Sequence, residues 1–285
     1  MKTVDIIIPI YNEEESAPNV IKEIKNTFNN SNFKFKITVV DDGSTDNSYN
    51  KIKDLCHNVI RNKVNKGYGA AIKKAIRHTD GELIVIIDAD GTYPPGAIPK
   101  LLEKLDDFDM IVGARTGKDV KIPFLRKPAK FIFLKLANYL SEYKIPDLNS
   151  GLRAFTRKSI EQYIHLIPNG YSLTMTVTLA YLCDGLDVEY IPIDYHKRIG
   201  KSKIKPLRDT KNFIFTILRT IMYFNPLKIC LPLSLILALA SIGVLIYSSK
   251  YLDRIMDGTV AVLAIASIQV IVIGLLADMI TKRSK

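Results

Sequence analysis

Three residue types that often carry chemistry are scarce in this chain. It contains no tryptophan, three cysteines and four histidines among its 285 residues. An odd number of cysteines, none with the spacing of a zinc site or redox pair, favours buried free thiols over a disulfide framework. The histidines show no metal-ligand spacing either. These residues are Cys56, Cys183, Cys230, His57, His78, His165 and His196.

Two common phosphate-binding motifs are also missing. No GxxxxGK[ST] sequence occurs, which excludes a P-loop. The stretch GYGAAI, residues 67–72, begins like a GxGxxG fingerprint but has Ile72 in place of the third glycine. It does not lie after the first predicted strand, where a dinucleotide-binding turn belongs. The remaining candidate is a nucleotide diphosphate that a metal ion holds.

The net charge is +11, from 40 Lys and Arg against 29 Asp and Glu. Such an excess suits nucleic acid, anionic lipid or phosphorylated substrates. No nucleic-acid-binding module or aromatic-basic platform is present, so we expect no nucleic-acid partner. With 47% hydrophobic residues, the chain is expected to fold around a packed core.

Long apolar runs are confined to the carboxyl-terminal end. The amino-terminal run is too short for a signal peptide and contains Asp5. Residues 229–249 and 259–280 each match the length of a membrane-spanning helix, which predicts a transmembrane hairpin. Lys and Arg flank its outer ends more than its connection, so the positive-inside rule places both chain ends in the cytoplasm. The flanking residues are Lys211, Arg219, Lys228, Lys282, Arg283 and Lys285, against Lys250 and Arg254 in the connection.

The first 206 residues are expected to form a cytoplasmic domain, followed by a juxtamembrane amphipathic helix at 207–228. Apolar strand-like runs alternate there with stretches of helical periodicity. Several runs are apolar on both faces, which predicts a mainly parallel sheet with helices on both faces. Residues 122–140 mix Phe and Leu with Lys and Arg and form a second candidate for an amphipathic helix at the membrane surface.

Polar clusters follow several of the predicted strands: PIYNEEE, DDGSTD, DADGTYPP and GARTGK. Ligands bind at the carboxyl ends of such strands, so these clusters predict one site at one sheet edge. Asp88 and Asp90 lie two residues apart directly after a buried strand. Their carboxylates suit Mg²⁺ or Mn²⁺, which take oxygen ligands and complete their shell with substrate phosphates. The alternative is a pair of turn-capping aspartates.

Six motifs occur in an order that resembles a known family: IIIPIYNEEE, VVDDGSTDNS, NKGYGAAIKKA, DADGTYPP, DLNSGLRAF and RIGKSK. Residues 4–228 resemble a family 2 glycosyltransferase of GT-A fold, a Rossmann-like mixed and mainly parallel sheet. More narrowly, they resemble the dolichyl-phosphate mannose synthase and polyprenyl-phosphate glycosyltransferase branch. A hairpin of two spans is similar to the membrane anchor of members with carboxyl-terminal helices.

The resemblance implies roles for individual residues. It assigns the acidic motif to the metal, with Thr92 where many members have a glutamine. It assigns three arginines to phosphates and a further group to the acceptor or donor sugar. The metal residues are Asp88, Asp90 and Thr92; the nucleotide residues are Pro9, Tyr11, Glu13, Val40, Asp41, Asp42 and Ala89; the arginines are Arg115, Arg126 and Arg198; the acceptor or sugar residues are Lys130, Asn149, Ser150, Gly151, Lys201 and Ser202.

The implied activity is the inverting transfer of one sugar from a UDP- or GDP-sugar to dolichyl or undecaprenyl phosphate, with Mg²⁺ or Mn²⁺. Two alternatives remain at this point. A processive polysaccharide synthase shares the early motifs, although the chain has no tryptophan for the Gln-x-x-Arg-Trp motif of those enzymes. A nucleotide-binding membrane scaffold without catalysis is the other. Donor, polyprenol and oligomeric state stay open.

Overall fold

The computed structural model describes residues 2–29, 31–116, 134–139, 141–170, 172–198, 206–252, 254 and 256–283. Two compact units make up the chain, Met1–Ile217 and Leu218–Lys285. Each unit has its own sheet or helix pairing, and each is described by itself.

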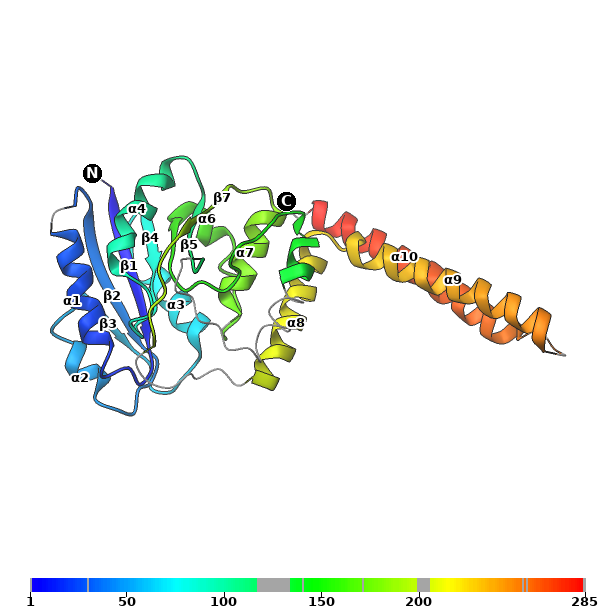
Figure 1. Ribbon diagram of the computed structural model, residues 1–285, viewed down its shortest axis with the longest axis horizontal. Coiled ribbons are helices and arrows are strands. Elements are labelled where there is room, and N and C mark those ends of the chain that lie inside the picture. The colour runs from blue at the N-terminus through cyan, green and yellow to red at the C-terminus, as the bar shows by residue number, and fades with distance from the viewer. Residues whose placement is uncertain are drawn as a thin grey trace. The chain divides into compact units, whose positions relative to one another are not determined.

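A seven-stranded sheet in the order β3-β2-β1-β4-β6-β5-β7 forms the centre of the first unit (Figure 1). Neighbouring strands are parallel except at β6, which is antiparallel to both β4 and β5. The predicted mixed, mainly parallel sheet is therefore confirmed. The strands are β1 (Thr3–Ile10), β2 (Lys34–Asp41), β3 (Asn58–Arg61), β4 (Leu83–Ile86), β5 (Met110–Ala114), β6 (Arg153–Thr156) and β7 (Val188–Pro192).

Helices cover both faces of this sheet (Figure 1). On one face, α1 (Ala17–Phe28), α2 (Ser48–Ile52) and α4 (Ile98–Glu103) share a core with β1, β2 and β4. On the other face lie α3 (Tyr68–Arg77) and α7 (Leu173–Cys183). Every residue of β4 and β5 is buried, which explains why these strands are continuously apolar in sequence. The short elements are η1 (Pro95–Ala97), η2 (Lys104–Asp106) and α6 (Arg157–Gln162).

Helix α1 illustrates how the sequence pattern produces the packing. Its residues Val20, Ile21, Ile24 and Phe28 recur at helical spacing and are all buried. Pro18 lies in the first turn, where the missing amide hydrogen has no helical partner to lose. Burying one such aliphatic side chain stabilises the fold by about 1.5–3 kcal/mol. This face therefore holds α1 against the sheet.

Helix α8 (Pro206–Phe224) precedes two long helices, α9 (Leu227–Tyr251) and α10 (Asp257–Arg283). The last two are long and apolar enough to cross a membrane, and they contain both predicted spans. They lie side by side (Figure 1). Most of the 122–140 segment lies outside the described residues.

Small residues line the seam between α9 and α10. Ser241 Oγ donates to Val260 O at 2.9 Å, and Ser267 Oγ donates to Ser234 O at 2.9 Å. A side chain at Gly274 would begin 2.5 Å from Cys230 Cβ, so glycine is needed for this approach. These pairs run in opposite directions along the chain, so the hairpin is antiparallel. The hydroxyls of Ser241 and Ser267 are thus satisfied inside the seam, as a lipid environment would require.

An ion pair at the amino ends of the strands fixes the sheet to its connections. Asp5 of β1 is 1% exposed, and its Oδ2 accepts from Gly81 N at 2.5 Å and Arg157 Nη2 at 3.1 Å. Arg157 also donates to Gly81 O at 2.6 Å and to Ile76 O at 3.1 Å. One guanidinium thus joins the start of α6 to β1, to the end of α3 and to the turn before β4.

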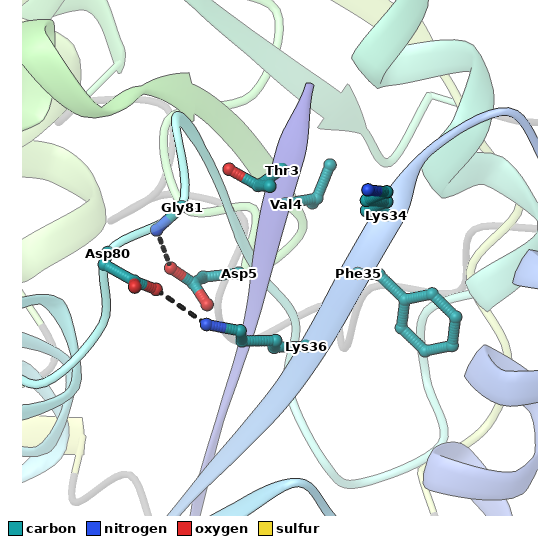
Figure 2. A pocket seen from close by; sticks show the side chains of 8 residues that line it. All are labelled: Thr3, Val4, Asp5, Lys34, Phe35, Lys36, Asp80 and Gly81. Carbon is teal, nitrogen blue, oxygen red and sulfur yellow. Dashed lines mark hydrogen bonds and ion pairs between the residues drawn. The ribbon is translucent and has the colours of Figure 1, made fainter. Parts of the chain in front are cut away.

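Asp5 also lines a small hollow with a volume of about 140 Å³, whose lining side chains are drawn in Figure 2. It lies at the amino ends of β1 and β2, away from the edge where the predicted site residues lie. Two of its lining residues form an exposed ion pair, Lys36 Nζ to Asp80 Oδ1 at 2.9 Å. The hollow is lined by Thr3, Val4, Asp5, Lys34, Phe35, Lys36, Asp80 and Gly81.

Replacing Arg157 by alanine should lower the free energy of unfolding of the first unit by about 3–5 kcal/mol, because Asp5 would remain as a buried, unpaired carboxylate. Near-ultraviolet circular dichroism of the tyrosines during urea unfolding measures the loss. Adding Asp5→Asn to Arg157→Ala should recover part of it. Lys36→Ala is the matched control, since it breaks an exposed ion pair in the same hollow and should change stability little. Equal losses of stability in Arg157→Ala and Lys36→Ala would contradict the role given to the buried Asp5–Arg157 ion pair.

Candidate active site

The residues predicted to hold the nucleoside gather where β1 and β2 end. Pro9 pairs with Val40 in the parallel register, and Ile10 pairs with Asp41. The backbone then leaves both strands together, with Asp42 N donating to Ile10 O at 2.9 Å. Because β4 is the other neighbour of β1, its carboxyl end lies at the same edge. Tyr11, Glu13 and Ala89 directly follow these strand ends.

Asp41 and Asp42 hold the surrounding turns. Asp41 Oδ1 accepts from Ser44 N at 2.8 Å, and Arg61 Nε lies 3.1 Å from its Oδ2. Asp42 accepts from Asn62 Nδ2 at 2.8 Å, and it also accepts from two backbone amides of the turn before α3. Both carboxylates therefore have a structural task, and the predicted contact with a nucleoside stays a prediction for each of them.

Asp90 is oriented from within its own motif. It is 7% exposed, and its Oδ1 accepts from Thr92 Oγ1 at 2.6 Å and from Thr92 N at 3.1 Å. Thr92 is fully buried. Its hydroxyl proton is engaged with Asp90, so in this structure Thr92 acts as a support for that carboxylate. A direct role of Thr92 as metal ligand stays a prediction.

Asp88 stands in an environment that opposes its charge. Its Oδ1 accepts from Tyr68 Oη at 2.8 Å. Burial, with a further contribution from the neighbouring Asp90, raises the pKa of Asp88 to about 6. Asp88 and Asp90 repel each other where water screens their charges poorly, so a positive charge placed beside them would be stabilising.

Arg198 supplies part of that positive charge. Its Nη2 donates to Glu13 Oε1 at 2.8 Å, and its Nη1 lies 3.4 Å from Asp90 Oδ2. The guanidinium thus connects the loop after β1 with the acidic motif after β4. Its Nε is buried and has no hydrogen-bond partner within the described parts of the chain. A buried donor of this kind indicates a place for an acceptor from a ligand or water.

The loop before β6 reaches the same edge from the other half of the sheet. Arg115, at the end of β5, forms a bidentate pair with Asp147, with Nε to Oδ2 at 2.7 Å and Nη2 to Oδ1 at 2.8 Å. Ser150 Oγ donates to Gly113 O at 2.5 Å. Asn149 Oδ1 is buried without a hydrogen-bond partner among the described residues. Arg115 is therefore held by protein, while Asn149 keeps an acceptor for another group.

Arg153 fixes this loop through hydrogen bonds to its backbone. The side chain is fully buried, and it donates to Ser150 O at 2.8 Å and to Leu148 O at 3.0 Å. It also donates to Thr178 Oγ1 of α7 at 2.6 Å. Burial lowers its pKa. The last three residues of DLNSGLRAF begin β6, a strand that the sequence interpretation did not assign.

Four predicted residues, Arg126, Lys130, Lys201 and Ser202, lie outside the described residues. The structure adds contributors that sequence reasoning did not select: Tyr68, Arg153 and Tyr93, whose Oη accepts from Gly151 N at 2.7 Å. Each of these residues lies inside a motif that the sequence analysis had noted, and this position could have marked it as a candidate. The position did not show which residues it contacts, because most of those partners are distant in sequence.

The donor set suits a hard divalent cation. Among the described residues, no three His, Cys, Asp or Glu side chains gather to form a closed metal site. Asp88 and Asp90 supply two carboxylates with unfavourable mutual repulsion. Mg²⁺ and Mn²⁺ prefer oxygen ligands, and Mg²⁺ commonly uses one or two carboxylates plus substrate phosphates. The residues present therefore fit such an ion.

Asp88→Asn should stabilise the protein at pH 7.5 by about 1–3 kcal/mol without divalent cations. The pKa of Asp88 in the folded state, about 6, lies above its ordinary value of 3.8. The wild-type protein therefore loses stability as pH rises through this interval, whereas the amide variant does not. Urea unfolding between pH 4 and 8 measures the difference, which should disappear near pH 4. The exposed control, Asp54→Asn, should show no such pH-dependent difference, and a constant gap for Asp88→Asn would contradict the argument.

Solved structures of similar fold include glucosyl-3-phosphoglycerate synthase from Mycobacterium tuberculosis in complex with phosphoglyceric acid. It is 20% identical, with a TM-score of 0.61 over 77% of this chain and 80% of that chain. The same enzyme in complex with Mn²⁺, UDP and glucosyl-3-phosphoglycerate gives 20% identity and a TM-score of 0.60, with the same shares covered. At this identity the likeness concerns the fold.

Two family models match the chain. The model of a GtrB C-terminal hairpin matches residues 225–282, which contain α9 and α10. The model of glycosyl transferase family 2 matches residues 5–164, more than half of the chain, and includes the acidic motif and the loop before β6. The sheet, the acidic edge and these matches agree, and the chain belongs to glycosyl transferase family 2.

Proposed function

We propose that this glycosyltransferase moves one sugar from a UDP- or GDP-sugar to a polyprenyl phosphate at the cytoplasmic face of a membrane. The observation that carries the proposal is the meeting of Asp88, Asp90 and Arg198 at one sheet edge. A carboxyl-terminal hairpin long enough to span a bilayer is the second support.

The donor would bind where β1, β2 and β4 end. Pro9 and Val40 are paired near the ends of β1 and β2, and Arg198 donates to Glu13 in the loop after β1. Asp88 and Asp90 would hold Mg²⁺ or Mn²⁺. When bound, the cation supplies positive charge that stabilises the leaving nucleoside diphosphate. The solved neighbour was crystallised with Mn²⁺ and UDP, so UDP-sugars and Mn²⁺ are the first conditions to test.

The protein's own groups would then orient the reactants. Arg198 has a buried Nε without a partner among the described residues, and a phosphate oxygen suits it. A phosphate monoester has its second pKa near ~6, so the acceptor is largely dianionic at neutral pH. Such a nucleophile needs no strong general base. The site has to position it and to offset charge repulsion, which gives the arginines their task.

Membrane attachment fits a lipid acceptor. Helices α9 and α10 have the length and composition of spans, and polyprenyl phosphate lies at the membrane interface. The excess of Lys and Arg at the outer ends of the hairpin supports a cytoplasmic catalytic unit. Attack from the face opposite the leaving group would invert the configuration at the sugar.

The decisive test is transfer by the purified full-length protein in detergent. It receives a panel of UDP- and GDP-sugars, Mn²⁺ or Mg²⁺, and undecaprenyl or dolichyl phosphate, and mass spectrometry detects the glycolipid. A metal-dependent product carrying one sugar is expected. Asp90→Ala should reduce it by more than ~100-fold, beyond the 10–100-fold typical of residues that only support a metal ligand. Asp54→Asn, an exposed acid elsewhere, should retain activity.

Other outcomes would overturn specific parts of the proposal. A polymeric product would indicate a processive synthase. Nucleotide binding without transfer to any polyprenyl phosphate would reject the lipid acceptor. Transfer that is unaffected by chelation and by Asp90→Ala would reject the role given to the acidic motif.

A further inference from the structure

The glycine-rich turn before α3 is fixed on one side by the segment after α6. Gly67 has φ +100°, and a Cβ atom there would lie 2.4 Å from Asn169 O. A Cβ atom on Gly69 would lie 2.0 Å from Pro168 O. Only glycine permits such an approach at both positions. The two glycines therefore hold a chain crossing in place.

Asp42 fixes the same turn from the other side. Its Oδ1 accepts from Lys66 N at 2.9 Å, and its Oδ2 accepts from Gly67 N at 2.7 Å. Lys73, one turn into α3, donates to Ile167 O at 2.8 Å. The backbone on which Tyr68 stands is thus anchored at both of its neighbours. Its side chain starts from a defined position.

The Tyr68 hydroxyl reaches across the sheet edge to the acidic motif and donates to Asp88 Oδ1 at 2.8 Å. A carboxylate can only accept, so the phenol hydroxyl is the donor in this bond. Asp90 receives hydrogen bonds from Thr92 of its own motif. Asp88 receives none from DADGTYPP among the described hydrogen bonds, and the Tyr68 hydroxyl is its donor.

Backbone also approaches the Asp88 carboxylate closely. A Cβ atom on Gly151 would lie 2.2 Å from Asp88 Oδ2, 2.5 Å from its Cγ and 2.8 Å from its Oδ1, so the loop before β6 packs against this carboxylate. Gly151 N in turn donates to Tyr93 Oη at 2.7 Å, which fixes the loop against the acidic motif. The Asp88 carboxylate is consequently bound by a phenol at Oδ1 and packed against the backbone of Gly151. These two contacts restrict its rotation.

We propose that Tyr68 is a positioning residue that sets the orientation of Asp88 for a divalent cation. The glycine-rich turn then has a task of its own: it delivers a hydroxyl to the metal-binding edge, as outer partners of metal ligands do. The inference rests on the proposed function, because it concerns the same cation. It assigns to Tyr68 a role in metal affinity and none in contact with the sugar.

The test is Mn²⁺ binding to Tyr68→Phe, a change that removes one oxygen and keeps the ring. Electron paramagnetic resonance of free Mn²⁺ measures affinity on the full-length protein in detergent, with and without UDP. We expect ~10- to 100-fold weaker binding in the variant, the range for lost outer-shell partners. The midpoint of thermal unfolding without metal should fall modestly, because Asp88 loses a hydrogen bond, and a single cooperative transition shows that the variant is folded. Transfer activity lost at low Mn²⁺ should return when Mn²⁺ is raised.

Tyr163→Phe is the matched control, because it removes a tyrosine–aspartate hydrogen bond to Asp184 at 2.5 Å in the same catalytic unit. It should leave Mn²⁺ affinity unchanged. Tight Mn²⁺ binding by the wild type and equally tight binding by Tyr68→Phe would overturn the inference and leave the proposed function standing. No Mn²⁺ binding by the wild type, with or without UDP, would overturn both. Equal weakening in Tyr68→Phe and Tyr163→Phe would also overturn the positioning role.

Discussion

The repulsion between Asp88 and Asp90 is the constraint around which the candidate site is arranged. Burial keeps water from screening the two charges, and the raised pKa of Asp88 records the cost. The protein tolerates this cost by surrounding the pair with directed donors. Thr92 donates a hydrogen bond to Asp90, and Tyr68 donates one to Asp88. Arg198 adds positive charge beside Asp90. The two carboxylates carry more negative charge than these donors neutralise, which is the condition under which they would hold a cation.

The two halves of the sheet reach this pair by different routes. Strands β1, β2 and β4 are parallel, so their carboxyl ends meet at one edge. Strand β6 is antiparallel, so it contributes the loop at its entry. That loop is held by the Arg115–Asp147 pair and by the buried Arg153, and both contacts lie within the protein. A glycine at position 151 lets the second half come close to Asp88.

Much of the fold was predictable, because parallel strands buried on both faces leave continuous apolar runs in the sequence. Polar clusters after those runs predicted the site edge, since parallel strands end together. Strand β6 was not predicted. Four residues, RAFT, carry too little periodicity to be told from a turn.

The individual contacts of the site were less accessible from sequence. Tyr68 and Asp88 are 20 residues apart, and Arg115 and Asp147 are 32 residues apart. No local pattern records such pairs, because they depend on which strands become neighbours. For the same reason Asp42, selected by resemblance as a nucleoside contact, is found holding Asn62 and the glycine-rich turn. The residue types pointed to chemistry, and the sheet order determined the partners.

The serine seam of the hairpin has a consequence for how the anchor is built. Ser234, Ser241 and Ser248 are buried and lie seven residues apart along α9. A strict seven-residue repeat on a helix of 3.6 residues per turn implies a left-handed supercoil. Hydroxyls and small side chains of the two helices supply the contacts of the seam, and contacts of this kind are the ones that hold helices together in lipid. The pairing of α9 with α10 therefore rests on residues of the hairpin itself.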